Sequence, residues 1–280
     1  MNEALKNNSF EKYIFVLYNL VHSKIIKSQE VFDYFIRLGE FNQITPSTMS
    51  EYYFTNLLKI VQDYVLNINN DFIEKVALIE LYYYKLFNKY DMKCFINIIN
   101  DDASVYADLY KYVYLDDDGN SKDKELSNRY FDLLYGLHFC PCIEAGKIKQ
   151  DELEKWVDDF KKCMINQNQS KIISTALGRI FAYSPIDDDN LPLCEAVRNV
   201  IEKEYDKRLD QSLRIEIFNS RGVYSVTDGE AEMNISNKYR EYSKKLVKQF
   251  PKTALIYEKL ADEYLNEANI QRKEAEDGRY

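Results

Sequence analysis

The side chains in this sequence that are best suited to binding are arginines, and most of them lie in its second half. Eight of the ten Arg residues follow residue 147. The guanidinium group is a rigid planar donor that binds carboxylates and phosphates and is frequent at protein interfaces. We therefore expect a binding surface in this half. Its candidate residues are Arg179, Arg198, Arg214, Glu216, Asn219 and Arg221.

These arginines also have a purely structural interpretation. Asp210 lies four residues before Arg214, and Glu195 lies three residues before Arg198. On a helix, residues at these spacings are neighbours on one face and can form ion pairs. Arginines paired in this way would stabilise helices and would not bind a ligand. Both interpretations are compatible with the sequence.

Catalytic chemistry has little support, because only His22 and His138 could act as a base near neutral pH. His22 lies in a stretch with the periodicity of an amphipathic helix, which is typical of a packed or surface histidine. We therefore name no catalytic residue and expect a non-enzymatic protein. The remaining enzymatic alternative is a hydrolase or transferase whose site would surround Arg179, Glu216 and Arg221.

A cluster of possible zinc ligands occurs at His138, Cys140 and Cys142. A structural zinc site needs four ligands, usually supplied as two separated pairs, and only the distant Cys163 and Cys194 could complete this one. The simpler interpretation is that the thiols pack as small apolar groups beside a loop. We expect no zinc site here.

The stretch from Tyr114 to Glu125 approaches the pattern of a calcium-binding loop. Asp116, Asp118, Gly119 and Glu125 match positions 3, 5, 6 and 12 of that pattern. Position 1 is Tyr114, which has no carboxylate to offer. We therefore interpret the stretch as a solvated acidic linker, and we expect neither a metal ion nor a cofactor in this chain.

A second weak motif is Gly146-Lys147, which suggests a phosphate-binding loop. Such a loop needs a Gly five residues before this pair and a Ser or Thr after it, and Pro141 and Ile148 occupy those positions. Gly146 is more simply interpreted as the residue that ends one helix before another begins.

The elements that must position these side chains are predicted to be helices. The 280 residues include only 8 Gly and 5 Pro, too few for a fold with many tight turns. Apolar residues recur at helical spacing, as at Tyr53, Leu57, Ile60 and Tyr64. The sequence therefore predicts an all-α fold in which antiparallel helix pairs stack as a degenerate α-solenoid or pack as a large helical bundle.

Helix ends are marked by capping residues. Ser9 and Ser28 are placed to cap helices over residues 10–22 and 29–38, and Gly39 to end the second helix in a left-handed conformation. Later in the chain, proline supplies this signal instead. Pro192 is expected in the first turn of one helix, and Pro251 at the start of the last.

Composition divides the chain into two parts. Residues 1–146 contain 16 of the 24 Tyr and carry 21 acidic against 14 basic side chains. We expect an aromatic, acidic helical lobe over residues 1–116 and a C-terminal helical lobe over residues 122–280. A single continuous domain is also compatible with a chain of this length.

The net charge of −9 disfavours nucleic acid as a partner, because an acidic protein repels phosphates except at a local basic patch. The first residues, Met1-Asn2-Glu3, do not resemble a signal peptide, and no stretch is apolar enough to span a membrane. Five irregularly spaced cysteines suit a reducing compartment. We expect a cytoplasmic protein without membrane contacts.

Residues 142–280 contain a series of recognisable short segments: Ala145–Ile148, Leu177–Arg179, Tyr183–Pro185, Leu191–Pro192, Glu195–Arg198, Phe218–Val223, Tyr239–Arg240, Pro251–Ala254 and Ala261–Asp262. Together they resemble the C-terminal helical segment of large, uncharacterised bacterial multidomain proteins, some of them defence-like. The resemblance implies a helical fold and an interaction role, since no reaction is assigned to that segment.

The function we expect is therefore that of a helical scaffold that binds another protein or a larger complex, as part of a bacterial defence system or another multicomponent system. Stacked helix pairs form extended surfaces, and tyrosine side chains supply contact area at a low entropic cost. The first alternative is binding of nucleic acid or a nucleotide through the arginine-bearing half.

Overall fold

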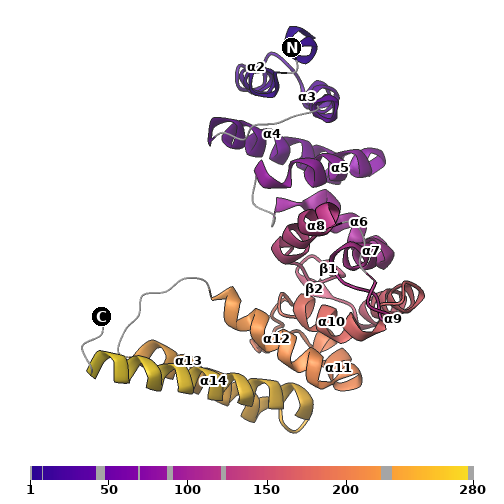
Figure 1. The fold of residues 1–280 in the computed structure, drawn as a ribbon. Helices are drawn as coiled ribbons and strands as arrows, with labels where there is room; N and C mark the ends of the chain where they lie inside the picture. Colours follow the sequence, from indigo (N-terminus) through magenta and orange to yellow (C-terminus); the bar gives the residue numbers. More distant parts are fainter. Residues whose placement is uncertain are drawn as a thin grey trace. The chain divides into compact units, whose positions relative to one another are not determined.

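The computed structural model describes residues 2–7, 9–41, 48–68, 70–86, 91–120, 124–221 and 229–276. Helices form nearly all of the regular structure in these residues, so the predicted all-α class is confirmed (Figure 1). The α-helices are α1 Asn2–Lys6, α2 Phe10–His22, α3 Ser28–Phe35, α4 Thr48–Asn67, α5 Ile73–Tyr83, α6 Lys93–Asp101, α7 Ala103–Val113, α8 Lys124–Gly136, α9 Gln150–Asn166, α10 Ile173–Phe181, α11 Glu195–Glu204, α12 Lys207–Ser220, α13 Glu230–Leu246 and α14 Pro251–Glu276.

Short 3₁₀ helices extend or precede several of these α-helices, and none of the described α-helices is both long and apolar enough to cross a membrane. The 3₁₀ helices are η1 Ile36–Glu40, η2 Asn70–Phe72, η3 Tyr84–Leu86 and η5 Ser170–Ile172.

A small β-hairpin interrupts the helices. Strand β1, Ile143–Glu144, pairs with β2, Lys147–Ile148, in antiparallel register. Between the strands, Ala145 has a φ of 49° and Gly146 a φ of 79°. Two successive positive φ angles are the signature of a tight hairpin turn, and glycine adopts them without strain. The prediction that Gly146 ends a helix was therefore wrong.

The described helices form two compact units. Unit 1 comprises Met1–Tyr114 and Ser121–His138, and unit 2 comprises Leu115–Asn120 and Phe139–Tyr280. The expected boundary lay between residues 116 and 122, whereas the structure groups helix α8 with the helices that precede it. The chain thus enters unit 2 briefly, returns to unit 1, and then completes unit 2.

The core of unit 1 is built from aromatic rings. Phe10 of α2 stacks on Tyr83 of α5 with ring centroids 5.2 Å apart, and Phe54 of α4 contacts the same tyrosine at 5.3 Å. Tyr13 is buried, and its hydroxyl donates to the carbonyl oxygen of Tyr34 at 2.8 Å. Such rings bury large apolar areas while their hydroxyls find partners. This packing accounts for much of the aromatic excess in the first half of the sequence.

Two glycines allow helices of unit 2 to approach closely. A Cβ atom on Gly178 of α10 would lie 2.5 Å from the backbone oxygen of Leu209 in α12. A Cβ atom on Gly229, which precedes α13 with a φ of 83°, would lie 2.3 Å from the backbone oxygen of Ala268 in α14. The pairs α10 with α12 and α13 with α14, which lie side by side in Figure 1, therefore depend on residues without a side chain.

The predicted helix boundaries have mixed outcomes. The helix over residues 10–22 and the start of the last helix at Pro251 are confirmed. Gly39 does not end α3, because it lies within η1, which continues from that helix without a left-handed residue. Ser28 lies inside α3, and the amide of Lys27 is bound instead by the carboxylate of Glu30 at 2.9 Å.

The helix expected to include Pro192 in its first turn starts later, at Glu195. Leu193 has a φ of 61°, and this left-handed residue separates the proline from the helix. The displaced start leaves a longer loop before α11.

Candidate functional site

The loop between α10 and α11 carries three consecutive aspartates, Asp187–Asp189, and is folded by its own polar groups. The carbonyl oxygen of Asp187 accepts from the amide of Asn190 at 2.9 Å, and Oδ1 of Asp189 accepts from the amide of Leu191 at 2.8 Å. Asn190 has a φ of 56°, a left-handed conformation that asparagine tolerates. The loop therefore turns sharply and directs the carboxylates of Asp187 and Asp189 towards α11.

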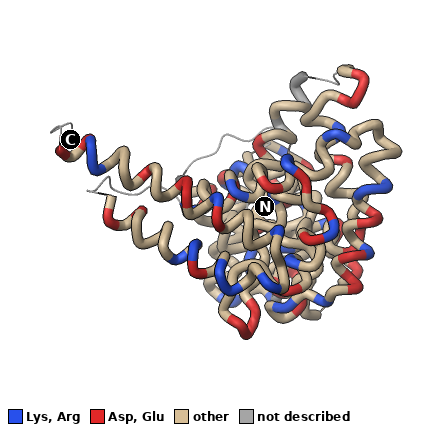
Figure 2. Tube along the Cα trace, turned by 90° about the horizontal axis from the view of Figure 1, so that it is seen from below, with Lys and Arg blue, Asp and Glu red and all other residues tan. Residues whose placement is uncertain are grey.

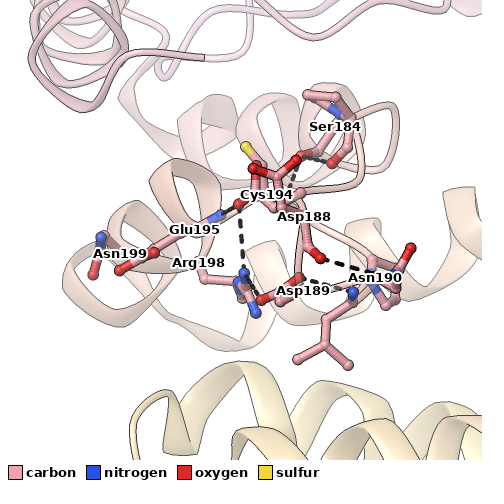
Figure 3. Close-up of polar contacts among 12 residues, drawn as sticks. Ser184, Asp188, Asp189, Asn190, Cys194, Glu195, Arg198 and Asn199 are labelled. Carbon is pink, nitrogen blue, oxygen red and sulfur yellow. Dashed lines mark hydrogen bonds and ion pairs between the residues drawn. The ribbon is translucent and has the colours of Figure 1, made fainter. Parts of the chain in front are cut away.

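Arg198 of α11 fixes this loop in place (Figure 3). Its side chain is only 2% exposed, and its Nη2 atom lies 2.6 Å from Oδ2 of Asp189 and 3.5 Å from Oδ2 of Asp187. The guanidinium also lies over the ring of Phe250, 5.0 Å from the centroid. Charge-assisted hydrogen bonds and a cation–π contact thus hold the loop against the helix.

The carboxylate of Asp189 is stabilised in its charged form. Partial burial alone would raise the pKa of Asp189, but the amide of Leu191 and the guanidinium of Arg198 outweigh it and lower that pKa below its usual value. Oδ2 of Asp187 accepts from the amide of Glu195 at 2.5 Å and so satisfies a free donor at the start of α11.

A surface hollow of about 450 Å³ lies beside the loop, and we call it the acidic hollow. Its walls come from the aspartate loop, from the first turns of α11, and from β2 and the start of α9. Four carboxylates line it, and no lysine or arginine is among its lining in the part of the chain that the structure describes. The lining residues are Ile148, Gln150, Asp187, Asp188, Asp189, Glu195, Ala196 and Asn199.

The acidic hollow offers anionic oxygens together with neutral amides. Asn199 donates to Oε1 of Gln150 at 3.1 Å, which joins α11 to α9 across the hollow. Asp188 is paired with Lys147 at 3.2 Å, but both side chains are largely exposed, and an exposed pair of this kind is weak. An ammonium or guanidinium group of another molecule could replace that lysine. The arrangement suits recognition of a basic side chain.

The arginines predicted to bind a ligand are paired with carboxylates of the chain. Arg214 lies 2.9 Å from Asp210, so the pair predicted from their four-residue spacing is confirmed, and it also bonds to Glu263 of α14. Arg198 is paired with the aspartate loop, so its predicted pairing with Glu195 was wrong.

The other two arginines also have carboxylate partners. Nε of Arg179 lies 3.8 Å from Glu216, whose carboxylate also accepts from the hydroxyl of Tyr183. Arg221 lies 2.7 Å from the buried Glu232 of α13 and contacts the ring of Tyr264.

Among the predicted residues, the structure pairs Arg179 with Glu216. Arg198, Arg214 and Arg221 belong to three separate ion-pair groups, and Asn219 is exposed near the end of α12. Along the paired helices that lead to the C-terminus, basic and acidic residues are interspersed (Figure 2). The predicted residues are thus distributed over α10, α11 and α12 and do not line the acidic hollow.

The stretch that resembles a calcium loop is a hydrogen-bonded turn. The carboxylate of Asp116 accepts from the amides of Asp118 and Asn120 at 3.0 and 2.8 Å. Asp117 accepts from the amide of Ser170 at 2.9 Å and from that of Lys171 at 3.2 Å. Hydrogen bonds from Asn120 lower the pKa of Asp116, and the pKa of Asp117 is lowered chiefly by the bond from the hydroxyl of Ser170 at 2.6 Å, together with the two backbone amides. Glu125 matches position 12 of the calcium-loop pattern, and its side chain lies outside the described residues.

The possible zinc ligands lie in a different setting. In the part of the chain that the structure describes, no group of three or more His, Cys, Asp or Glu side chains could hold a metal ion. None of the five cysteines, all of which lie within the described residues, forms a disulfide. Cys140 and Cys194 are buried, and burial raises the pKa of the Cys140 thiol well above its usual value.

A second open surface, the aromatic patch, lies on unit 1. It consists of Phe15, Tyr18 and His22 on α2 with Tyr52 and Tyr53 on α4. Tyr18 contacts Tyr53 with ring centroids 4.7 Å apart, and Phe15 contacts Tyr53 at 5.6 Å. Phe15 and Tyr52 remain about half exposed. Exposed aromatic residues of this kind are enriched at protein interfaces.

Sequence reasoning missed the acidic hollow. The Asp187–Asp189 run was visible, but without calcium-loop spacing it was interpreted only as an acidic loop. The wall of the acidic hollow also includes Gln150 and Asn199. Neither residue belongs to a recognisable sequence motif. The one usable signal was the buried position of Arg198 in the stripe of α11, since a buried arginine requires a carboxylate partner nearby.

Comparison of the chain with models of known protein families, with curated proteins and with solved structures gives no match.

Proposed function

We propose that this protein is a helical protein-interaction module and that the acidic hollow binds a basic side chain of its partner. The observation that carries this proposal is the lining of the hollow, where four carboxylates meet two neutral amides and no lysine or arginine is among the described residues that line it. The basic partners of these carboxylates within the chain are the buried Arg198 and the exposed Lys147. A lysine or arginine placed there would gain several oxygen acceptors at once.

The rigidity of the hollow supports this proposal. The carboxylates of Asp187 and Asp189 are already oriented by backbone amides and by Arg198. Binding to preorganised groups costs less conformational entropy. The aromatic patch on unit 1 offers a second surface with the composition of an interface, which a scaffold could use for a further contact.

The test measures binding of a fluorescein-labelled decapeptide of alternating lysine and serine, followed by fluorescence anisotropy. We expect the 280-residue chain to bind it and the double variant Asp188→Asn, Glu195→Gln to bind about fivefold more weakly, since the exposed ion pairs that are lost together contribute about 1 kcal/mol. Neither residue contacts Arg198, so the loop should keep its fold.

The matched control is the double variant Asp158→Asn, Glu241→Gln, which removes the same charge from exposed positions on α9 and α13. Its affinity should change less than twofold, and a peptide with glutamate in place of lysine should not bind. Equal weakening in both double variants would show that only net charge matters. That result, or no binding of the lysine peptide, would exclude the proposed site.

Nucleic-acid binding through the arginines has less support. Arg179, Arg198, Arg214 and Arg221 each have a carboxylate of this chain as a partner, and phosphate would have to displace it. Filter binding of DNA and RNA over a range of salt concentrations tests this alternative, because phosphate contacts weaken steeply as salt rises.

The biological setting we propose is a bacterial cytoplasmic complex. Five cysteines without a disulfide suit a reducing compartment. The resemblance of residues 142–280 to the helical ends of bacterial multidomain proteins, some of them defence-like, supports a place in a multicomponent system such as antiphage defence. Loss of phage protection after deletion of the gene, restored by the intact gene but not by the variant Asp188→Asn, Glu195→Gln, would support this setting.

A further inference from the structure

Unit 1 contains a buried carboxylate at the contact of three helices. Glu80 of α5 is completely buried. Its Oε1 atom accepts from Nε2 of Gln62 in α4 at 2.7 Å and from the amide of Cys94 at 3.1 Å, and its Oε2 atom accepts from the amide of Phe95 at 2.8 Å. The two amides belong to the first turn of α6, where helix donors lack partners within the helix. One side chain thus joins α4, α5 and α6.

Within the described residues, no cation faces this carboxylate. From α4 it meets the neutral amide of Gln62, and from α6 it meets the two backbone amides and the thiol of Cys94. The nearest basic residue in the sequence of α6, Lys93, is directed to Asp63, with 4.0 Å between Nζ and Oδ1. A buried charge without a counter-charge is costly, even when it is hydrogen-bonded.

Gln62 links the buried carboxyl group to the chain just before α6. Its Nε2 atom donates both to Glu80 and to the carbonyl oxygen of Asp91. Its Oε1 atom is buried and accepts no hydrogen bond within the described residues. Gln62 therefore meets Glu80 as a neutral donor and supplies no charge that would offset the charge of an ionised carboxylate.

Burial and hydrogen bonding act in opposite directions on this group. Burial raises the pKa of Glu80, the bonds from Gln62, Phe95 and Cys94 lower it, and the net effect brings the pKa to about 7. Both protonation states are therefore accessible near neutral pH.

We propose that Glu80 is a proton-dependent clamp on α6: while it carries a proton, α6 stays closed against α4 and α5, and loss of the proton makes α6 open more often. The buried geometry carries this inference, because each bond from α6 to Glu80 must break when the helix moves away, and the ionised group gains water when it does. Opening of α6 exposes Cys94, which is completely buried in the closed state.

The test follows alkylation of Cys94 by N-ethylmaleimide in the 280-residue chain, with peptide mass spectrometry to separate it from the other four cysteines. The rate is measured between pH 5.5 and 8.5 in the wild type and in Glu80→Gln. The ratio of the two rates removes the intrinsic pH dependence of the thiol. We expect the ratio of wild type to variant to rise at least tenfold over this range.

The matched control is Glu74→Gln, which removes an exposed carboxylate from the same helix. Its rate should follow that of the wild type at every pH. A ratio of wild type to Glu80→Gln that stays constant with pH would overturn the proposal.

Hydrogen exchange of the wild type supplies a second measurement that needs no folded variant. After correction for intrinsic rates, protection of the α6 amides should fall at least tenfold between pH 5.5 and 8.5, whereas protection of α9 in unit 2 should not. Constant protection of α6 would show that Glu80 has only a static structural role.

Discussion

Arg198 determines the shape of the acidic loop because it is buried whereas its two aspartate partners are partly exposed. Water can solvate Asp187 and Asp189 when the pair breaks, but it cannot reach the guanidinium without opening the packing against Phe250. The ion pairs therefore stabilise unit 2 mainly by fixing the geometry of the loop. Any variant of Arg198 should affect both the stability of unit 2 and the acidic hollow.

We expect Arg198→Ala to lower the free energy of unfolding by about 3 kcal/mol, because it removes one partner of a buried ion pair together with the packing of its stem. Arg198→Lys should cost less, since it keeps the charge but loses the planar fork. Urea denaturation followed by tryptophan fluorescence measures the free energy of unfolding of both variants. An alanine variant with an unchanged midpoint would contradict this role.

The protonation of Glu80 also predicts how the stability of unit 1 depends on pH. Its pKa is raised from 4.5 to about 7 on folding, so the folded state binds the proton more tightly than the unfolded state does. The resulting stability is complete below pH 4.5 and is lost as the pH rises through 7. The loss should amount to about 3 kcal/mol at 1.4 kcal/mol per unit.

Urea denaturation followed by far-UV circular dichroism at pH 5 and pH 8 measures this loss. Glu80→Gln should remove most of the difference between the two pH values, because its amide does not titrate. The same pH dependence in both proteins would assign the effect to other groups.

Helix packing in unit 2 depends on Gly178, where α10 touches the backbone of α12. We expect Gly178→Ala to destabilise the protein by about 2 kcal/mol or more, because the new methyl group would overlap backbone atoms that cannot rotate away. Gly39→Ala is the matched substitution, since its methyl group would meet only Ile79 at an ordinary 3.5 Å. Denaturation midpoints measure both, and equal midpoints for the two variants would contradict the close approach.

Most helices could be predicted from sequence, because an amphipathic stripe and a proline or polar residue at its start are local signals. The spans of α2 and the start of α14 at Pro251 are examples. The end of α3 near Gly39 and the hairpin turn at Gly146 could not be predicted, because a glycine can either end a helix or form a hairpin turn. The backbone angles that distinguish these uses depend on neighbouring segments.

The candidate site was predictable only where its contacts are local. The pair of Arg214 with Asp210 lies within one helix, so spacing alone predicts it. The partners of Arg198 precede it by nine and eleven residues, in a loop whose turns reverse the chain. Gln150 and Asn199 come from different helices and meet only through tertiary packing.

At the scale of the whole molecule, two units with separate cores predict unfolding in two steps. The single tryptophan, Trp156, is buried in α9 of unit 2, whereas circular dichroism reports the helices of both units. We expect the urea transitions seen by fluorescence and by circular dichroism to differ in midpoint. If the fluorescence and circular dichroism transitions coincide, and if Gly178→Ala shifts both midpoints equally, the chain unfolds as one cooperative unit.

The path of the chain between the units has a consequence for dissecting the gene. Because Leu115–Asn120 belongs to unit 2 and Ser121–His138 to unit 1, no single truncation point yields two intact halves. A fragment that starts at residue 139 lacks Asp117, the acceptor for the amides of Ser170 and Lys171. We expect a synthetic peptide of residues 114–121 to supply the missing acceptor when it is added to that fragment. The fragment and the peptide together would then form a complementation assay.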